Sequence, residues 1–409
     1  TTIGDPDGLD TTYTFDGLGN RTAQQSPDTG SSSATYDAAG NLLSRTDARS
    51  IASAYTYDAL NRIASVSYPD STQNVAYHYD DADSVTGCSG SYPVGRLTRV
   101  VENGGGTVFC YDLRGNVTRK QQTTLAGTDT TSYAYTLADR PSGLTYPSGG
   151  VVTYVRDVDG RIQSTSLTPP GGSTATAVSA VTYLPFGPVA GYTLGNGQAV
   201  TRSYDTNYRL TDLTSPALAL HFARDAMGNI VALGNTPGAS PATETYAYDP
   251  LYRLTTVTEA GGAVLESYTY NKTGDRLSKA ATGPVTGTGT YSYTSGTHQL
   301  IGIGAASRTN DANGNTTGSV MGGETFGFGY SDRNRMALVQ RNGPTVGTYT
   351  YNAFGQRTGK DASFPLSVSQ RYGYDEGSRL LDEYGTSNRD YVWMDDLPVA
   401  VVDETVSGG

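Results

Sequence analysis

Aromatic and polar side chains alternate in short stretches from one end of the sequence to the other. Pairs of tyrosines two positions apart, separated by one small or polar residue, recur along the chain. They are Tyr55/Tyr57, Tyr77/Tyr79, Tyr133/Tyr135, Tyr246/Tyr248, Tyr268/Tyr270, Tyr291/Tyr293, Tyr349/Tyr351 and Tyr372/Tyr374. A spacing of two places both rings on one face of a β-strand, a setting that large aromatic residues favour. The pattern therefore predicts many short strands, each with one aromatic face.

A turn signal follows each aromatic stretch. It has the form Asp-x-x-Gly in residues 16–19, 37–40, 112–115 and 225–228. An aspartate caps the first position of a type I turn, and a left-handed glycine then lets the chain reverse into a hairpin with a bulge. The glycine position holds Asn61 in one unit, and Asn tolerates this conformation well. It holds Tyr208 and Tyr252 in two others, for which the turn itself gives no explanation.

A second alternating stretch comes after each turn, as in the Arg-Ile/Leu-x-x-Val runs of residues 62–66, 96–100 and 253–257. Each unit is therefore predicted to be two short antiparallel strands. Successive units are roughly 20 to 25 residues apart, so the chain is a repeat array. Counted from the Asp or its replacement, the units start at Asp16, Asp37, Asp58, Asp80, Asp112, Leu137, Asp157, Leu184, Asp205, Asp225, Asp249, Asn271, Ser295, Asp311, Ser331, Asn352 and Asp375.

We predict an all-β fold in which these antiparallel hairpins lie side by side in one strip. The array is expected to run continuously over residues 1–402, with residues 403–409 as a C-terminal tail. The Gly- and Pro-rich stretches 168–173 and 283–289 are interpreted as loops at the edge of the strip, because the repeat resumes after both. No segment shows a convincing helical period of apolar residues.

The composition fits a thin sheet better than a thick core. Hydrophobic residues make up 36% of the 409 residues and charged residues 16%, while the chain contains 31 tyrosines and 51 glycines. Both percentages lie below ordinary globular usage. Such a chain can stack tyrosines between neighbouring strands, but it cannot build one large aliphatic core.

The charge balance argues against two classes of partner. A net charge of -11 leaves no basic patch that would neutralise nucleic-acid phosphates. No stretch approaches the roughly 20 apolar residues of a membrane helix, and no charged-then-apolar leader opens the sequence. We therefore expect no nucleic acid and no membrane span, and we expect the chain to be a segment of a longer protein.

Cys88 and Cys110 lie 22 positions apart, which is about one repeat. Equivalent positions in neighbouring strands can come within disulfide distance. The sequence leaves two alternatives open, a disulfide or two free buried thiols.

The repeated units resemble the YD repeats of the Rhs family, and the resemblance covers essentially the whole chain. Its motifs are Tyr57-Asp58-Ala59-Leu60-Asn61-Arg62-Ile63, the run of residues 111–120, and the run of residues 391–401 that contains Trp393. These stretches look like bacterial Rhs proteins in particular. The resemblance implies a long β-strip that spirals into a hollow shell, related to the shells of insecticidal toxin complexes and to the barrel of teneurins.

The resemblance also implies a function. In bacterial members the shell encloses a toxic C-terminal domain, so the implied partner is a polypeptide cargo and the implied location is secreted or at the cell surface. Those shells end in a core with an Asp-Pro-x-Gly motif and a second Asp-Pro pair, whose aspartates release the toxin. Asp395-Asp396-Leu397-Pro398 and Asp5-Pro6-Asp7-Gly8 lack that spacing and order, so no such residues are carried over.

Candidate catalytic and metal-binding residues are interpreted as structural. The acidic groups Asp80/Asp81/Asp83, Asp157/Asp159 and Asp395/Asp396 lie in turn contexts where aspartate serves the backbone. Residues 157–160 and 311–315 resemble the start of a calcium loop but lack the downstream Glu.

Other chemical motifs are equally incomplete. His78, His221 and His298 stand alone in the sequence, no nucleophile elbow surrounds a Ser or Cys, and residues 302–304 lack the third Gly of a phosphate cradle. The glycosylation sequons at Asn20, Asn116, Asn271 and Asn315 are by-products of the turn. We predict no catalytic residue, no cofactor and no metal.

A rival function remains open at this point. Exposed tyrosines beside Asp and Asn can hold sugars by stacking and hydrogen bonding. The alternative to a toxin shell is therefore an extracellular adhesion or carbohydrate-binding stalk built from the same strip.

Overall fold

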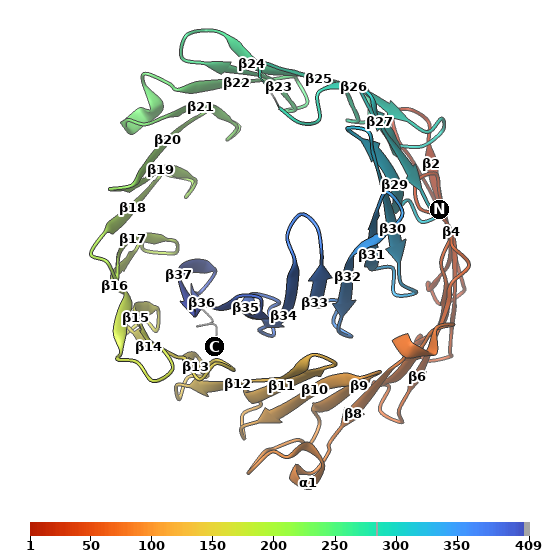
Figure 1. The fold of residues 1–409 in the computed structure, drawn as a ribbon, viewed down its shortest axis with the longest axis vertical. Helices are drawn as coiled ribbons and strands as arrows, with labels where there is room; N and C mark the ends of the chain where they lie inside the picture. The colour runs from red at the N-terminus through yellow and green to blue at the C-terminus, as the bar shows by residue number, and fades with distance from the viewer. Residues whose placement is uncertain (284, 405–409) are drawn as a thin grey trace.

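The computed structural model describes residues 1–283 and 285–404, and it is a single β-strip. Its 37 strands form one sheet in which every strand pairs antiparallel with the next strand along the chain. The strip curves round into a ring and its last strands lie inside that ring (Figure 1). The predicted all-β array of hairpins is therefore confirmed.

The strands are short and follow one another in a meander. They are β1 (Thr2–Gly4), β2 (Asp10–Phe15), β3 (Arg21–Ser26), β4 (Gly30–Tyr36), β5 (Leu42–Thr46), β6 (Ala52–Tyr57), β7 (Ile63–Ser67), β8 (Val75–Tyr79), β9 (Leu97–Glu102), β10 (Gly105–Tyr111), β11 (Val117–Thr124), β12 (Gly127–Tyr135), β13 (Pro141–Thr145), β14 (Val151–Arg156), β15 (Ile162–Thr168), β16 (Ala175–Tyr183), β17 (Val189–Leu194), β18 (Ala199–Tyr204), β19 (Leu210–Ser215), β20 (Leu218–Arg224), β21 (Ile230–Gly234), β22 (Glu244–Tyr248), β23 (Leu254–Glu259), β24 (Val264–Tyr270), β25 (Arg276–Ala281), β26 (Gly289–Tyr293), β27 (Leu300–Ile303), β28 (Ala306–Asn310), β29 (Thr316–Met321), β30 (Glu324–Tyr330), β31 (Met336–Arg341), β32 (Thr345–Tyr351), β33 (Arg357–Ala362), β34 (Val368–Tyr374), β35 (Leu380–Gly385), β36 (Asn388–Met394) and β37 (Leu397–Glu404).

The predicted turn joins most even-numbered strands from β2 onward to the next strand. The exceptions are β8, which is followed by a longer loop, and β36, which only Asp395 and Asp396 connect to β37. In the first unit the carboxylate of Asp16 accepts hydrogen bonds from the backbone N–H groups of Leu18 and Asn20, both at 2.9 Å. Gly19 has φ +84° and closes the turn on the carbonyl of Asp16. The strand register then shifts between Thr14 and Phe15, which is the expected bulge. Local sequence thus dictates each reversal.

The two tyrosines at the glycine position adopt the same backbone conformation as glycine. Tyr208 and Tyr252 both have φ +61°, and each donates its N–H to the carbonyl of the turn aspartate. Two predicted unit starts were wrong by one residue, because the turn begins at Thr136 instead of Leu137 and at Thr294 instead of Ser295. Threonine can replace the aspartate there since its hydroxyl also accepts backbone hydrogen bonds.

In ten units of the described chain, the tyrosine that ends an even-numbered strand joins its hairpin to the one before it. Its hydroxyl donates a hydrogen bond to the carbonyl of the first residue of the last strand in the preceding hairpin, at 2.6 to 3.0 Å. The donors are Tyr36, Tyr111, Tyr135, Tyr183, Tyr204, Tyr248, Tyr270, Tyr293, Tyr330 and Tyr374. The tyrosine therefore supplies a directed bond between repeats as well as packing area.

Units without a tyrosine at this position use another donor for the same purpose. Arg156 bonds the carbonyl of Pro141 at 2.8 Å, Arg224 bonds that of Leu210 at 3.1 Å, and the indole N–H of Trp393 bonds that of Leu380 at 2.8 Å. Phe15 ends the first unit, where no complete hairpin precedes it. Arginine and tryptophan N–H groups can thus replace the tyrosine hydroxyl at this position.

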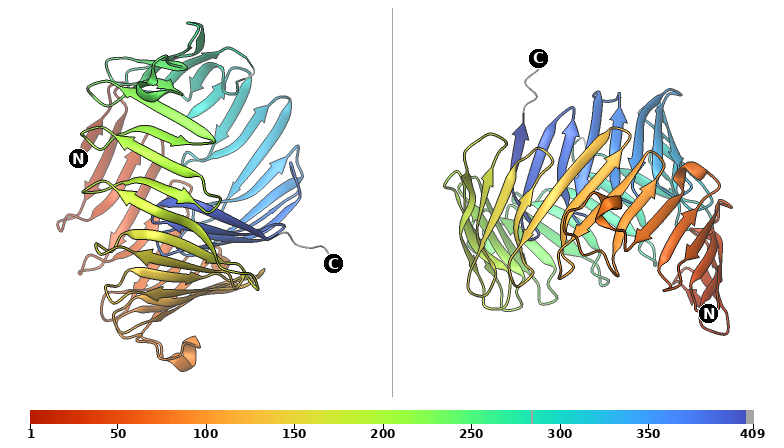
Figure 2. Two further views of the ribbon diagram at one scale, coloured as in Figure 1. Left: turned by 90° about the vertical axis from the view of Figure 1, so that its left-hand side faces the viewer. Right: turned by 90° about the horizontal axis from the view of Figure 1, so that it is seen from below.

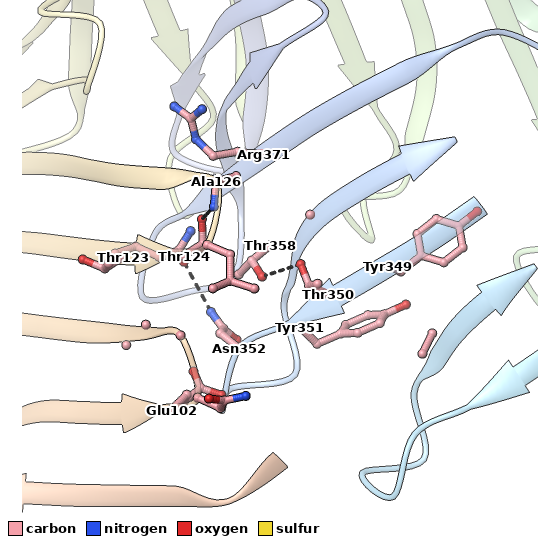
Figure 3. A pocket seen from close by; sticks show the side chains of 18 of the residues that line it. Glu102, Thr123, Thr124, Ala126, Tyr349, Thr350, Tyr351, Asn352, Thr358 and Arg371 are labelled. Atoms are coloured by element: carbon pink, nitrogen blue, oxygen red, sulfur yellow. Dashed lines mark hydrogen bonds between the residues drawn. The ribbon is translucent and has the colours of Figure 1, made fainter. Parts of the chain in front are cut away.

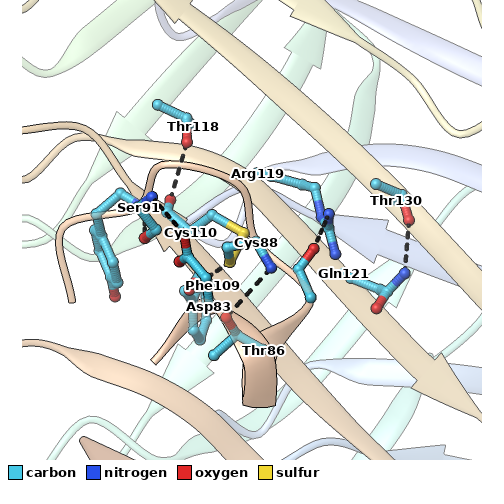
Figure 4. The surroundings of a disulfide bond; sticks show 12 residues. Asp83, Thr86, Cys88, Ser91, Phe109, Cys110, Thr118, Arg119, Gln121 and Thr130 are labelled. Atoms are coloured by element: carbon cyan, nitrogen blue, oxygen red, sulfur yellow. Dashed lines mark hydrogen bonds between the residues drawn. A yellow bond between two sulfur atoms is a disulfide. The ribbon is translucent and has the colours of Figure 1, made fainter. Parts of the chain in front are cut away.

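Helix is confined to short pieces in the part of the chain that the structure describes. These are α1 (Asp83–Thr86) and the 3₁₀ turns η1 (Ser71–Gln73) and η2 (Pro237–Ala239). The α1 loop is fastened to β10 by a disulfide between Cys88 and Cys110, whose Cα atoms are 5.7 Å apart (Figure 4). The disulfide is thus the alternative that the structure adopts, although the two cysteines do not lie in paired strands.

The strip completes a full winding and then overlaps itself. We call β1–β23 the first winding and β24–β37 the second winding. In Figure 1 the strands β27–β31 lie beside β2–β6, and β33–β37 lie inside the arc of β9–β16. The side views in Figure 2 show the strands standing across the strip, with turns along both of its edges. The loop around residues 168–173 lies at such an edge, between β15 and β16.

The expected tail falls mainly on residues 405–409, outside the described residues, whereas Asp403 and Glu404 belong to β37. The stretch 283–289 joins β25 to β26, and its residue 284 also lies outside the described residues.

The hydrophobic core forms where the two windings overlap. One cluster joins Leu144, Tyr146 and Val152 of the first winding to Leu381 and Val392 of the second. A second cluster joins Ile162 and Val178 to Met394, and a third packs Ala353 against Val75, Val100 and Phe109. The strip is thus a thin wall that gains a two-layer core only at its overlap.

Candidate functional site: the seam between the two windings

The seam is the set of contacts through which the second winding closes the ring on the first. It begins at the N-terminal end with His298, which follows β26. The Nε2 atom of His298 lies 2.6 Å from a carboxylate oxygen of Asp5, and its Nδ1 atom lies 2.6 Å from one of Asp275. Hydrogen bonding to Asp275, reinforced by Asp5, raises the pKa of His298 to about 9. A charged imidazolium therefore joins the first β-turn of the chain to the second winding at neutral pH.

Polar turn-to-turn contacts continue the seam along the edge. Asn313 donates to Asp47 at 2.7 Å and accepts from the backbone N–H of Ala48 at 3.0 Å. Arg333 bonds the carbonyl of Gln73 at 2.9 Å and pairs with Glu102 at 2.7 Å. These bonds match turns of the second winding to turns of the first, so they fix the register of the overlap.

Farther along, the second winding moves inside the first and the contacts become buried. Lys120 is 5% exposed and donates to the carbonyl of Tyr374 at 2.8 Å. Arg371 reaches back to β12 and forms a two-pronged pair with Asp129, at 3.0 and 2.9 Å. Burial of these charges is tolerated because each has a partner on the facing winding.

Two buried aspartates in the overlap have raised pKa values. Asp382 and Asp390 are 1% and 2% exposed and face each other in the register of β35 and β36. Burial, reinforced by Asp129 and Asp390, raises the pKa of Asp382 to about 8. Burial also raises the pKa of Asp390, although Ser148 and Tyr384 bond its carboxylate at 2.6 and 2.5 Å.

The carboxylate of Asp382 has no hydrogen-bond partner, and it occupies the space above Gly373 on the neighbouring strand. An ideal Cβ at Gly373 would lie 2.2 Å from that carboxylate. Glycine is therefore needed opposite Asp382, and the acid is held in a site that favours its neutral form.

A cavity of about 550 Å³ lies in the seam, between residues of the first and second windings. Its lining includes Glu102, Gln122, Arg333, Tyr349 and Arg371, from both windings. Figure 3 shows Thr123 and Thr124 facing Asn352 and Thr358 across it. The lining is rich in hydroxyl, amide and charged groups, so it suits a polar occupant.

The acidic groups that the sequence singled out do not come together. Asp80 pairs with Arg62 at 2.8 Å, and Asp81 pairs with Arg99 at 2.8 Å. Asp157 accepts from the N–H groups of its own turn, and Asp311 does the same in its unit. Asp396 lies exposed near Arg379. In the structure Asp157 and Asp311 thus accept bonds within their turns, while Asp80 and Asp81 form ion pairs between neighbouring strands or turns.

Sequence reasoning missed the histidine contacts. His298 bridges two aspartates, and Nδ1 of His221 lies 2.5 Å from Asp212 on the neighbouring strand. The interpretation that these two histidines stand alone was therefore wrong. Asp212 lies nine residues before His221 and directly opposite it, a pairing that the hairpin register would have revealed.

Searches for two further features gave negative results within the described residues. No group of three or more His, Cys, Asp or Glu side chains there is placed to hold a metal ion. No helix in the described part of the chain is long and apolar enough to cross a membrane.

Comparison with known proteins identifies the repeat. Residues 36–73 match the sequence model of the RHS Repeat family. The fold matches the crystal structure of TcdB2-TccC3 with a TM-score of 0.75 over 94% of this chain, at 16% identity. The chain therefore contains an RHS repeat and has the fold of that structure. Its YD repeats span 23% of the length of that TcdB2-TccC3 chain.

Two related structures show the same likeness. The Photorhabdus luminescens Tc holotoxin pore, with a mutation in TccC3, has a TM-score of 0.75 over 94% of this chain and 22% of its own, at 16% identity. The TcdB2-TccC3-Cdc42 complex has a TM-score of 0.73 over 95% of this chain and 24% of its own, at 16% identity. No curated protein sequence matches the chain.

Proposed function

We propose that this YD-repeat strip is a wall segment of a bacterial Rhs-type toxin, and that it encloses a C-terminal toxic polypeptide. The observation that carries the proposal is the closed ring, in which the strip overlaps itself and its last strand β37 lies inside the first winding (Figure 1). The proposed role is structural and uses no catalytic residue, cofactor or metal. The proposed location is secreted or at the cell surface.

The aromatic face of the first winding is its inner face. Tyr133 in β12 bonds Glu376 of the second winding at 3.3 Å, and Tyr154 in β14 packs against the clusters that contain Val392 and Met394. Since the second winding lies inside the first, these tyrosines face inward. Successive aromatics of a unit share a face, so the other tyrosine pairs line the interior as well. Such a lining offers a polypeptide both apolar rings and hydroxyl groups.

A container also needs a closed wall. Hydrogen bonds from tyrosine hydroxyl groups join neighbouring hairpins along the strip. The seam joins the two windings through pairs such as Arg371 with Asp129. A free β-edge would bind other chains, and the overlap shields part of the strip from such contacts. These features favour a barrier over a set of separate binding modules.

The test is protection of a cargo from protease. An unstructured marker polypeptide fused after residue 409 should be digested several-fold more slowly than the same marker fused before Thr1. Arg371→Ala leaves Asp129 buried without its partner and should restore fast digestion. Equal digestion of both fusions in the wild-type chain would contradict the proposal.

The seam cavity favours the second candidate, a carbohydrate-binding stalk. Tyr349, Gln122 and Arg333 provide ring, amide and guanidinium groups of the kind that bind sugars. A glycan array separates the two functions. Saturable binding of one glycan, abolished by Tyr349→Ala and accompanied by an unprotected marker, would favour the stalk.

A further inference from the structure

Large apolar side chains stand exposed at the tips of eight YD turns in the first winding, whereas the tips at residues 38–39 and 206–207 carry Ala-Ala and Thr-Asn. We call the edge formed by these turns the YD rim and the edge with the intervening turns the opposite rim. The exposed fractions of the tip residues range from 63% to 103%. The residues are Leu18, Leu60, Leu113, Leu137, Val158, Phe186, Met227 and Leu251. An apolar row of this length is unusual on a surface that faces only water.

The same rim in the second winding already serves as an interface. There the tips at Asn313 and Arg333 are polar and dock on polar turns of the first winding. The tip formed by Ala353 and Phe354 is apolar, and it packs on an apolar cluster. Phe354 lies edge-on to Phe109, with ring centroids 6.1 Å apart. Tips of the YD rim therefore bind surfaces whose polarity matches their own.

We propose that the YD rim of the first winding is an interface with a second copy of this chain, joined rim to rim about a two-fold axis. An apolar row is complementary to itself because hydrophobic contact has no direction. A two-fold axis perpendicular to the axis of a spiral maps a spiral edge onto one of the same hand and pitch. The two rims can therefore meet along their whole length in a closed, isologous dimer.

Area and charge fit this partner. A stable interface buries about 800 Å² on each side, and eight mostly exposed side chains of this size supply an apolar area of that order. Some charges on the rim pair with opposite charges, as for Arg114 with Asp139 at 3.1 Å and Arg161 with Asp159 at 3.0 Å. The turn aspartates Asp16, Asp37, Asp112 and Asp225 are instead bonded by asparagine side chains.

The opposite rim offers no such row. Its strongly exposed apolar residues include Leu125 and Leu366, at 89% and 74%, with polar turns between them. The two rims thus provide a matched comparison within one molecule.

Sedimentation equilibrium of the whole chain tests the proposal. We expect a monomer–dimer equilibrium for the wild-type protein. The triple variant Leu60→Asp, Leu113→Asp and Leu137→Asp should weaken the dimer about 100-fold, because three desolvated apolar contacts are replaced by charges. The control Leu125→Asp with Leu366→Asp adds charge to the opposite rim and should leave the dimer unchanged. Circular dichroism and thermal unfolding of each variant show that the strip remains folded.

Three results would overturn the proposal. A wild-type chain that stays monomeric at high concentration has no partner copy. Formation of open-ended assemblies by the wild-type chain, and their loss in the control variant, would show that the contact involves the opposite rim. Binding to neutral lipid vesicles that the triple variant abolishes, in a chain that does not dimerise, would assign the rim to a membrane surface.

Discussion

Tyr248 donates its hydroxyl hydrogen to the carbonyl oxygen of Ile230, 2.7 Å away, across the boundary between two hairpins. Ile230 begins β21 and Tyr248 ends β22, so the bond closes the junction at the YD rim. The same relationship recurs in unit after unit. It explains why the second aromatic of the repeat is almost always a tyrosine, since phenylalanine would fill the same space without the bond.

Replacing Tyr248 by Phe should therefore weaken the junction while preserving its packing. We expect the free energy of unfolding to fall by about 1 kcal/mol, the usual net worth of one hydrogen bond. Urea denaturation of the whole chain measures this loss, and Tyr208→Phe at an exposed turn tip is the control. Equal effects of the two substitutions would show that the hydroxyl bond of Tyr248 contributes nothing.

Gly17 and Gly19 in the turn of residues 16–20 allow the cost of a left-handed backbone to be measured apart from the cost of steric crowding. Gly17 and Gly19 both have room for a Cβ atom, since nothing lies within 4 Å of either position. Only Gly19 has a left-handed backbone, with φ +84°. Gly19→Ala should cost about 1 kcal/mol of unfolding free energy, whereas Gly17→Ala should be neutral or slightly stabilising. Thermal unfolding compares the pair, and a cost shared by both would point to crowding at the turn.

Asp382 should make the seam less stable as the pH rises. Its pKa is about 8 in the folded protein, above the ordinary value of 3.8, so the folded state binds the proton more tightly than the unfolded state. The stability this proton provides is fully present below pH 3.8 and is lost as the pH rises through 8. Asp382→Asn keeps the shape and removes the charge.

We expect the Asp382→Asn variant to unfold with a shallower pH dependence between pH 4 and 8, and to exceed the wild type in stability above pH 8. Asp390 and Glu376, whose pKa values are also raised by burial, account for the remaining slope. Urea midpoints measured across this pH range decide the matter. Identical slopes for the variant and the wild type would assign the pH dependence to the other acids.

The bridge formed by His298 should also lose its stabilising effect as the pH rises, as Asp382 does. Its pKa of about 9 lies above the ordinary 6.5, so the bridge is complete below pH 6.5 and is lost as the pH rises through 9. His298→Gln should speed hydrogen exchange of the β-turn at residues 5–9 at pH 7. The expected effect is small, about 0.5–1 kcal/mol, because the imidazole is partly exposed. At pH 10 the wild type and the variant should exchange alike, and a difference that persists there would rule out the charge as its cause.

Removing the disulfide should release a loop and leave the strip intact. Cys88 and Cys110 are 22 residues apart, and closing a loop of that length stabilises a fold by about 2–4 kcal/mol. The double substitution of both cysteines by Ser should make residues 81–96 the first site of cleavage in limited proteolysis. Reduction of the wild type with dithiothreitol should reproduce that cleavage. Cleavage elsewhere first would show that β10 depends on the bond.

Features with a local cause were predictable from the sequence. The Asp-x-x-Gly turns and the aromatic pairs are fixed by neighbours within one unit, so hairpins and strip followed from them. The unit starts at Leu137 and Ser295 were wrong because Thr136 and Thr294, not an aspartate, begin those turns. With no aspartate to mark the start of the turn, these two positions could not be located to the residue.

Features that join distant residues left no such signal. The role of Arg156 and Arg224 as substitutes for tyrosine depends on a carbonyl in the neighbouring hairpin. Asp5 lies 293 residues from His298, and nothing in either local sequence predicts their meeting. The seam and its buried acids depend on the curvature of the strip, which accumulates over many strands and is not encoded in any one of them.

The long sequence separation across the seam sets an order of events during synthesis. Each hairpin needs only its neighbour and can form as the chain emerges, whereas the hydrogen bonds of the seam join residues 230 to 293 positions apart. At about 5–20 residues per second, Asp5 waits tens of seconds for the synthesis of its partner His298. Throughout that interval the nascent ring is an open arc with its tyrosine face accessible. Substitutions that delay closure would prolong this interval without altering any contact of the finished protein.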